Sequence, residues 1–220
     1  MNGKTALLAG ATGLVGTKLL AILLKESNYE KVYVLVRKLL NVKCSKLIEI
    51  MTDFRNLERV QQHFAVDDVF CCLGTTLKKA GSKEAMYLVD VEYPFQLAKL
   101  TEQQGAKQFL QISSMNANPH SLLWYPKMKG ELEEKIKLIP FQSMAIIRPS
   151  LLLGKRNEHR LMEELASTLI RGLNKMTGKV NRRLAIDAEE VALAMFSIAQ
   201  MNRKGIAVYS SEQLGTFAKR

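Results

Sequence analysis

The chain has 220 residues, 47% of them hydrophobic, which predicts one globular domain with a sizeable core and excludes a disordered chain. Lysine and arginine number 32 against 21 acidic residues, so the protein is basic, with a formal net charge of +11. Because these cations are spread along the chain, with only a mild concentration over 155–183 and no recognisable nucleic-acid-binding module, we expect a solvated basic surface and no nucleic-acid partner.

The chain opens with a strand, a glycine-rich turn and a helix. An apolar segment over 6–9 runs into Gly10, Gly13 and Gly16, and an apolar-periodic helix then continues to Lys25. This order places a pyrophosphate on a helix N-terminus, where free N–H groups and the helix dipole favour an anion. The spacing is G-x-x-G-x-x-G, a variant of the usual dinucleotide fingerprint. A tight structural turn with no ligand is the alternative interpretation.

Strands and helices alternate after this opening. Five more buried strands are predicted over 31–37, 46–51, 67–74, 107–114 and 143–149. Helical patterns cover 56–64, 83–104, 126–138 and 187–200, and a last short strand covers 206–209. Gly105 is a C-cap signal for the second of these helices. The alternation predicts parallel pairing with right-handed crossovers, and therefore a doubly wound parallel α/β sheet of the Rossmann type.

The alternation becomes less regular after residue 149. A helical pattern over 158–173 precedes the helix that begins at Asp187, with Asp187 as N-cap and Glu190 completing a capping box. We expect one domain over 1–220, in which 150–186 and 201–220 contribute a small substrate-side lobe. Such a lobe would cover the carboxyl ends of the strands, where ligands bind in sheets of this kind.

Two cations close the second predicted strand. Arg37 and Lys38 stand where the adenosine ribose of a bound dinucleotide would lie. An acidic residue there would bind the 2′-hydroxyl, whereas two cations suit a 2′-phosphate, so NADP(H) is favoured over NAD(H). The alternative is a basic strand end with no ligand.

Three further residues follow predicted strands and are candidates for cofactor contact. Asp53 could bind the adenine amino group or could act only as a local turn residue. Gly74 and Thr75 follow the fourth strand, where the backbone would approach a cofactor closely. A simple turn is the competing interpretation.

Tyr125 and Lys129 are the candidate catalytic pair. Four residues apart on a helix, they share one face. An ammonium beside a phenol lowers the pKa of the phenol toward working pH, which suits a general acid or base for a carbonyl/alcohol pair. Ser113 or Ser114, at the end of the fifth strand, could hydrogen-bond the carbonyl oxygen. The sequence does not distinguish which of the two serines makes this hydrogen bond.

The order of these motifs resembles the short-chain dehydrogenase/reductases. The glycine turn, the two serines and Tyr125-x-x-x-Lys129 follow that family's order. The resemblance is closest to the atypical branch that includes the Tat-interacting tumour suppressor and its bacterial relatives. It is carried by the segments 71–90, 125–133 and 148–160 and covers the chain from the first glycine to about residue 160.

The resemblance implies an NADP(H)-binding fold with Tyr125 and Lys129 at the catalytic positions. It also implies cofactor contacts from Thr12, Gly13, Leu14, Val15, Arg37 and Lys38, and near Leu152 and Arg160. One departure from the family is Pro126, since a residue before proline is pushed away from helical dihedrals. We therefore expect Tyr125 at the entrance of its helix.

The function expected from these residues is oxidoreduction. Hydride would pass between the nicotinamide of NADP(H) and a small carbonyl or alcohol substrate. The alternative is an NADP(H)-binding regulatory module that docks a protein partner without turnover.

The same sequence suggests a compartment and excludes some cofactors. No apolar run approaches the roughly 20 residues of a membrane span, and the first residues lack the layout of a signal peptide. We therefore expect a cytoplasmic protein with no membrane span. The three cysteines and three histidines have no metal-ligand spacing, so we expect no metal.

Overall fold

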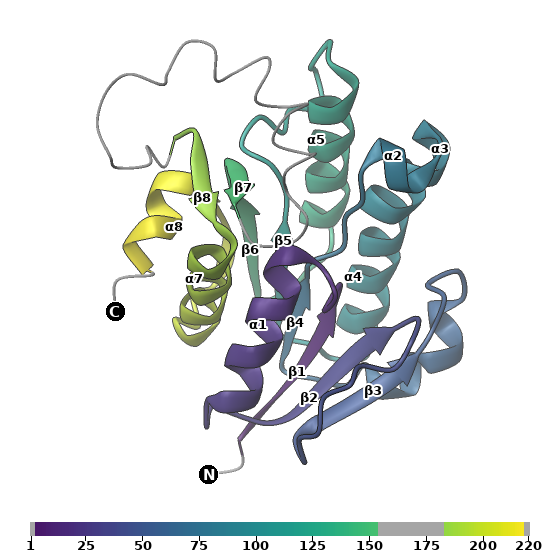
Figure 1. The fold of residues 1–220 in the computed structure, drawn as a ribbon, viewed down its shortest axis with the longest axis vertical. Coiled ribbons are helices and arrows are strands. Elements are labelled where there is room, and N and C mark those ends of the chain that lie inside the picture. The colour runs from purple at the N-terminus through teal and green to yellow at the C-terminus, as the bar shows by residue number, and fades with distance from the viewer. Residues whose placement is uncertain (1–2, 154–182, 218–220) are drawn as a thin grey trace.

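The computed structural model describes residues 3–153 and 183–217, and within them a parallel sheet of seven strands forms the centre of the molecule (Figure 1). The strand order is β3-β2-β1-β4-β5-β6-β9, and every neighbouring pair is parallel. The strands are β1 Lys4–Ala9, β2 Tyr29–Val36, β3 Leu47–Met51, β4 Asp68–Cys71, β5 Gln108–Ile112, β6 Ser143–Arg148 and β9 Gly205–Ser210. The predicted doubly wound parallel sheet is confirmed.

Helices cover both faces of this sheet. One face carries α1 Leu14–Lys25, α7 Ala188–Gln200 and α8 Ser211–Phe217, with α1 and α7 packed side by side (Figure 1). The other face carries the 3₁₀ helix η1 Leu57–His63 together with α4 Tyr93–Gln103 and α5 Trp124–Lys137. Two layers of helices explain why the inner strands β1, β4, β5 and β6 read as nearly continuous apolar runs, since both faces of this part of the sheet are covered. The edge strand β9 is less covered and leaves Ile206 and Val208 exposed.

The first strand and helix show how the sequence produces this packing. The last four residues of β1, from Ala6 to Ala9, are fully buried. On α1 the side chains of Val15, Leu19 and Leu23 recur every fourth residue, so they share one buried face. Full burial of a leucine side chain stabilises the fold by roughly 1.5–3 kcal/mol, which makes this face the main attachment of α1.

The strand order reverses between β1 and β4, and this defines a crevice at the carboxyl edge of the sheet. Ala9, the last residue of β1, pairs with Cys71 of β4 on one side and Leu35 of β2 on the other. The loops that follow these strands therefore meet at one edge. In doubly wound sheets, ligands bind at this reversal point.

The helix predicted over 83–104 is continuous but changes its geometry twice. It consists of α3 Lys83–Tyr87, the π-helical segment η2 Leu88–Glu92, and α4. Within it the N–H of Tyr93 donates to the carbonyl of Leu88, five residues earlier. The short helix α2 Leu77–Ala80 precedes it. Gly105, at φ +88°, follows its last turn, so the predicted C-cap is confirmed.

The C-terminal segments join both the main sheet and a smaller one. β7 Leu151–Leu153 pairs in parallel with β8 Ala185–Asp187 in a separate sheet. Asp187 caps α7 as predicted, accepting a hydrogen bond from the N–H of Glu189 at 2.7 Å. The segment 201–220 also supplies β9, an edge strand of the main sheet. The helical pattern predicted over 158–173 lies outside the described residues.

No helix in the described ranges has the length and apolar character that crossing a membrane requires.

Candidate cofactor and active site

The glycine turn after β1 is shaped by close backbone contacts. Gly10 has φ +88°, and a Cβ there would lie 2.4 Å from the carbonyl oxygen of Cys72. A Cβ on Gly16 would lie 2.1 Å from the carbonyl oxygen of Gly10. Side chains are therefore excluded at both positions, and their absence brings α1 directly onto the end of β1. Gly13 is less tightly enclosed, since its Cβ would meet the same oxygen at 3.3 Å.

The N-terminus of α1 is built to receive an anion. Gly13 is the N-cap and offers no side-chain acceptor to the N–H groups of the first turn, which also contains no acidic residue. Thr12 is exposed and Leu14 half-buried, whereas the Val15 side chain is buried in the core. Val15 could therefore contact a cofactor through its backbone N–H but not through its side chain. Uncapped donors at a helix N-terminus fit a pyrophosphate.

Arg37 and Lys38 follow directly after β2 and are exposed. Because Leu35 of β2 pairs with Ala9 of β1, both cations lie at the edge of the sheet that carries the glycine turn. Neither forms an ion pair with another described residue. Their charge is thus available to a phosphate.

Asp53 has a local hydrogen bond, as the turn interpretation requires. Its Oδ1 accepts from the N–H of Arg55 at 3.0 Å, two residues on. Leu152, in β7, is half-buried and packs against the core on the side of α1 and α7. Arg160 lies outside the described residues.

Gly74 and Thr75 lie against Asp90. A Cβ on Gly74 would meet only Asp90 Oδ1, at an ordinary contact distance of 3.5 Å, so the packing does not require glycine. The N–H of Thr75 donates to Asp90 Oδ2 at 2.8 Å. The loop after β4 is thereby fixed to η2.

Tyr125 and Lys129 lie on the first turns of α5 but in different environments. The helix begins at Trp124, so Tyr125 stands in its first turn, at the entrance as expected, with its side chain 41% exposed. The Lys129 side chain is buried, with its Nζ 2.7 Å from Asp90 Oδ1. Burial alone would lower the pKa of Lys129, but the Asp90 carboxylate and the nearby Tyr125 phenol outweigh it and raise that pKa.

The two candidate serines differ in their hydrogen-bond partners. Ser113 Oγ donates to Glu133 Oε1 at 2.5 Å, and Glu133 also forms a two-point ion pair with Arg148. Ser114 Oγ is buried and has no hydrogen-bond partner among the described residues. A buried hydroxyl without a partner is costly unless a ligand or water completes it. Of the two, Ser114 is therefore the one able to receive a substrate oxygen.

Two residues of the site, Asp90 and Glu133, escaped the sequence-based prediction. Glu133 continues the four-residue spacing of Tyr125 and Lys129, and buried apolar side chains flank this stripe along α5. This polar stripe on an apolar helix face is the feature of the sequence that could have identified Glu133. Asp90 stands between two valines within an apolar helix, which marks a buried acid.

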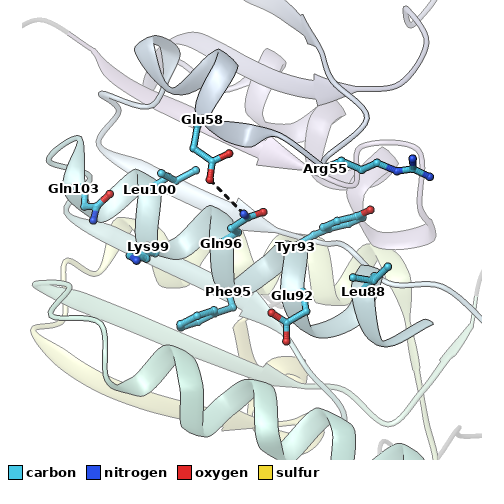
Figure 2. Close-up of a pocket in the computed structure, with 10 residues that line it drawn as sticks. All are labelled: Arg55, Glu58, Leu88, Glu92, Tyr93, Phe95, Gln96, Lys99, Leu100 and Gln103. Atoms are coloured by element: carbon cyan, nitrogen blue, oxygen red, sulfur yellow. Dashed lines mark hydrogen bonds between the residues drawn. The ribbon is translucent and has the colours of Figure 1, made fainter. Parts of the chain in front are cut away.

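Two surface cavities lie beside the segments that carry these residues. One, of about 680 Å³, lies between η1 and α4, where Glu58 accepts a hydrogen bond from Gln96 (Figure 2). The other, of about 480 Å³, lies between α3 and the start of α5 and is lined in part by Trp124. No residue predicted for the site lines either of them. In the described ranges, no group of three or more His, Cys, Asp or Glu residues is placed to hold a metal ion.

Comparison with known families and proteins gives consistent matches. The model of the NAD dependent epimerase/dehydratase family matches residues 6–144. Protein HTATIP2 of Rattus norvegicus is 34% identical over 170 residues, covering 76% of this chain and 70% of that protein. Protein FMP52, mitochondrial, of Candida glabrata is 34% identical over 161 residues, covering 72% of this chain and 68% of that protein.

Solved structures match the fold over nearly the whole chain. The complex of MoeE5 with UDP-glucuronic acid and NAD superposes with a TM-score of 0.72 at 20% identity, covering 94% of this chain and 75% of that one. The dTDP-4-dehydrorhamnose reductase of Bacillus anthracis, in complex with NADP, gives a TM-score of 0.67 at 16% identity, covering 100% of this chain and 82% of that one. At these identities the likeness is one of fold.

The relatives contradict the expected compartment. The FMP52 proteins of Candida glabrata and Aspergillus niger are named mitochondrial. The prediction of a cytoplasmic protein is therefore wrong. It rested on the missing apolar signal peptide, but mitochondrial transit peptides are amphipathic and have no such apolar run.

Proposed function

This chain belongs to the NAD dependent epimerase/dehydratase family, and from that premise we propose that it is an NADP(H)-dependent oxidoreductase that interconverts a small carbonyl compound and its alcohol. When bound, the nicotinamide supplies or accepts the hydride. The observation that supports the proposal is the buried Ser114 Oγ at the carboxyl end of β5, which has no partner among the described residues, together with the buried Lys129 ammonium one helical turn after Tyr125 on α5.

Each of the three polar residues has a part in the proton chemistry. In the reduction, the Tyr125 hydroxyl gives its proton to the carbonyl oxygen, and the phenolate regains a proton from solvent, to which the side chain is open. Lys129 stabilises that phenolate by its charge. Ser114 Oγ donates a hydrogen bond to the same oxygen and stabilises the negative charge that develops there.

The glycine turn and the two cations after β2 would hold the cofactor. The uncapped N–H groups of α1 bind the pyrophosphate, and Arg37 and Lys38 bind the 2′-phosphate, which favours NADP(H) over NAD(H). The backbone N–H groups of Leu14, Val15 and Gly16 supply the anion contacts. Segments 150–186 and 201–220 would contribute to a small substrate-side lobe, and 201–220 supplies β9 of the main sheet as well.

A turnover screen tests this proposal. Aldehydes, ketones and quinones are offered with NADPH, and cofactor oxidation is followed for the native chain and for Tyr125→Phe. We expect turnover of at least one carbonyl class, and loss of roughly 10²–10⁴-fold in Tyr125→Phe, the usual contribution of general acid catalysis. NADPH binding should survive the substitution. Unchanged turnover would remove Tyr125 from the mechanism.

A second candidate is an NADP(H)-binding regulatory module without turnover. The observation that favours it is the 41% exposure of Tyr125, which lines neither of the two cavities described above. Such a module would bind NADPH and a protein partner but oxidise no cofactor. NADPH binding without turnover across the whole carbonyl panel would select this candidate.

A further inference from the structure

Asp90 and Lys129 form an ion pair that is almost entirely removed from solvent. The Lys129 Nζ lies 2.7 Å from Asp90 Oδ1, and their side chains are 4% and 2% exposed. The other carboxylate oxygen of Asp90 accepts from the Thr75 N–H at 2.8 Å. One carboxylate therefore joins the loop after β4 to the helix that carries Tyr125.

The backbone around Asp90 is unusual in a way that serves this contact. Asp90 is the middle residue of the π-helical segment η2, between α3 and α4. A π-turn widens the helix locally and changes the direction of its side chains, and such turns often occur at functional sites. The acid is thus placed by a local departure from α-helical geometry.

Among the residues that the structure describes, no other charge near Lys129 can take the place of Asp90. The groups that act on its ammonium are Asp90 from η2, Tyr125 from its own helix and Cys71 from β4. Burial raises the pKa of Cys71 to about 12, so this thiol stays neutral. Glu133, one turn further along α5, is already paired with Arg148. Asp90 is the anion that balances Lys129.

We propose that Asp90 is a positioning residue of the Tyr125 site: its carboxylate fixes the Lys129 ammonium beneath the phenol and holds it in the charged form. The inference rests on the proposed function, in which that charge stabilises the Tyr125 phenolate. Without the carboxylate, a buried amine releases its proton more readily, because a low-dielectric surrounding disfavours the cation. The phenolate then loses its charged neighbour, and proton donation weakens as the pH rises.

Lysine titration in the cofactor-free protein tests this directly. The protein is labelled with ¹³C-lysine, the Cε signal of Lys129 is identified by its absence in Lys129→Met, and its midpoint is followed with pH. In the native chain we expect a midpoint above the roughly 10.4 of free lysine. In Asp90→Asn it should fall by about one pH unit or more, within the range that burial produces. Asp90→Glu should restore most of the loss.

The chain offers a matched control in Glu92. Glu92 pairs with Lys135 at the same 2.7 Å and across the same two elements, but both side chains are about 40% exposed. Glu92→Gln should leave the Lys129 midpoint unchanged. An unchanged midpoint in Asp90→Asn would overturn the proposal. If that variant does not fold, the native titration decides, since a midpoint at or below the free value overturns it and a higher one supports it.

The pH profile of turnover separates a positioning role from a merely structural one. Relative to the native chain, Asp90→Asn should lose little activity near pH 6 and progressively more as the pH rises through its lowered Lys129 midpoint, reaching about tenfold one pH unit above that midpoint, with little change in KM for NADPH. A loss independent of pH would contradict the inference. Absence of turnover in the native chain would defeat the proposed function instead, while the titration would still test Asp90.

Discussion

Ser113 and Ser114 are neighbours in the sequence, yet the Ser113 hydroxyl is bonded to Glu133 at 2.5 Å and the Ser114 hydroxyl is buried without a partner among the described residues. Successive side chains at the end of a strand point to opposite sides, which separates the two environments. Ser113 belongs to the ion-pair network of α5 and β6. Ser114 is left as a donor at the carboxyl edge of the sheet.

Substitution of each serine should therefore have a different effect. Ser114→Ala should lower kcat by roughly 10²–10³-fold, the usual effect of losing one donor to a developing oxyanion, with little change in stability. Ser113→Ala removes a hydrogen bond to a charged group and should cost about 1.5–3 kcal/mol of stability. Its kcat should fall less than that of Ser114→Ala. Steady-state kinetics and urea unfolding of both variants check this. A larger kcat loss in Ser113→Ala would reverse the assignment.

Gly16 gives a second prediction, from packing. A methyl group on Gly16 would have to fit 2.1 Å from the Gly10 carbonyl, so Gly16→Ala must move α1 away from the turn. Such overpacking typically costs about 1–3 kcal/mol, or roughly 2–12 °C of Tm in a chain of this length. Calorimetry measures this, with Gly74→Ala as the control, since its Cβ meets nothing closer than 3.5 Å. Equal Tm values for the two variants would contradict the packing account.

Most of the fold could be predicted from the sequence because its signals are local. Buried parallel strands such as β1 have continuous apolar runs, and Gly10 and Gly16 mark a turn whose geometry excludes side chains. The family resemblance was confirmed, as was the helix cap at Asp187. These features depend on neighbours in the chain, so their pattern is visible in the sequence.

The polar contacts of the site could not be predicted in the same way. The pairing of Asp90 with Lys129 joins residues 39 positions apart and depends on the π-turn, which has no sequence signature that we recognised. The assignment of Ser113 to Glu133 likewise depends on how α5 packs against the sheet. Tertiary packing decides such contacts, and a single sequence does not contain it explicitly.

The cations after β2 give a third prediction, on cofactor preference. Arg37→Ala combined with Lys38→Ala should weaken NADPH binding by about 100-fold or more while NADH binding changes little, because charge-assisted hydrogen bonds to the 2′-phosphate contribute about 1.5–3 kcal/mol each. Isothermal titration with both nucleotides measures this. Lys31→Ala, exposed near the opposite end of the same strand, is the control. An equal loss for the two nucleotides would reject the 2′-phosphate contact.

Asp67 gives a prediction on pH and stability. Its carboxylate accepts from the Thr5 N–H at 2.9 Å and pairs with Lys107 at 3.0 Å. Burial opposes ionisation, but these partners outweigh it and lower the pKa of Asp67. A lowered folded pKa gives stability that is present above the unfolded value of about 3.9 and is lost as the pH falls through the folded value.

Asp67→Asn should therefore cost about 1 kcal/mol near pH 7, a modest value because the carboxylate is partly exposed to solvent. The difference from the native chain should shrink toward pH 2, as the pH falls through the lowered folded pKa of Asp67 and the native carboxyl takes up a proton as well. Urea unfolding at both pH values measures it, with the exposed Glu30→Gln as control. A difference that persists unchanged at low pH would show that charge is not its cause.

The central claim is that the glycine turn and the cations after β2 bind a phosphorylated dinucleotide, and thermal unfolding with NADPH and NADH tests it most directly. A ligand that binds only the folded chain stabilises it by about 2.7 kcal/mol at a hundredfold excess over Kd, which corresponds to roughly 5–11 °C of Tm. We predict a rise of this size with NADPH, at concentrations where NADH produces a smaller one. No rise in Tm with either nucleotide would contradict the account.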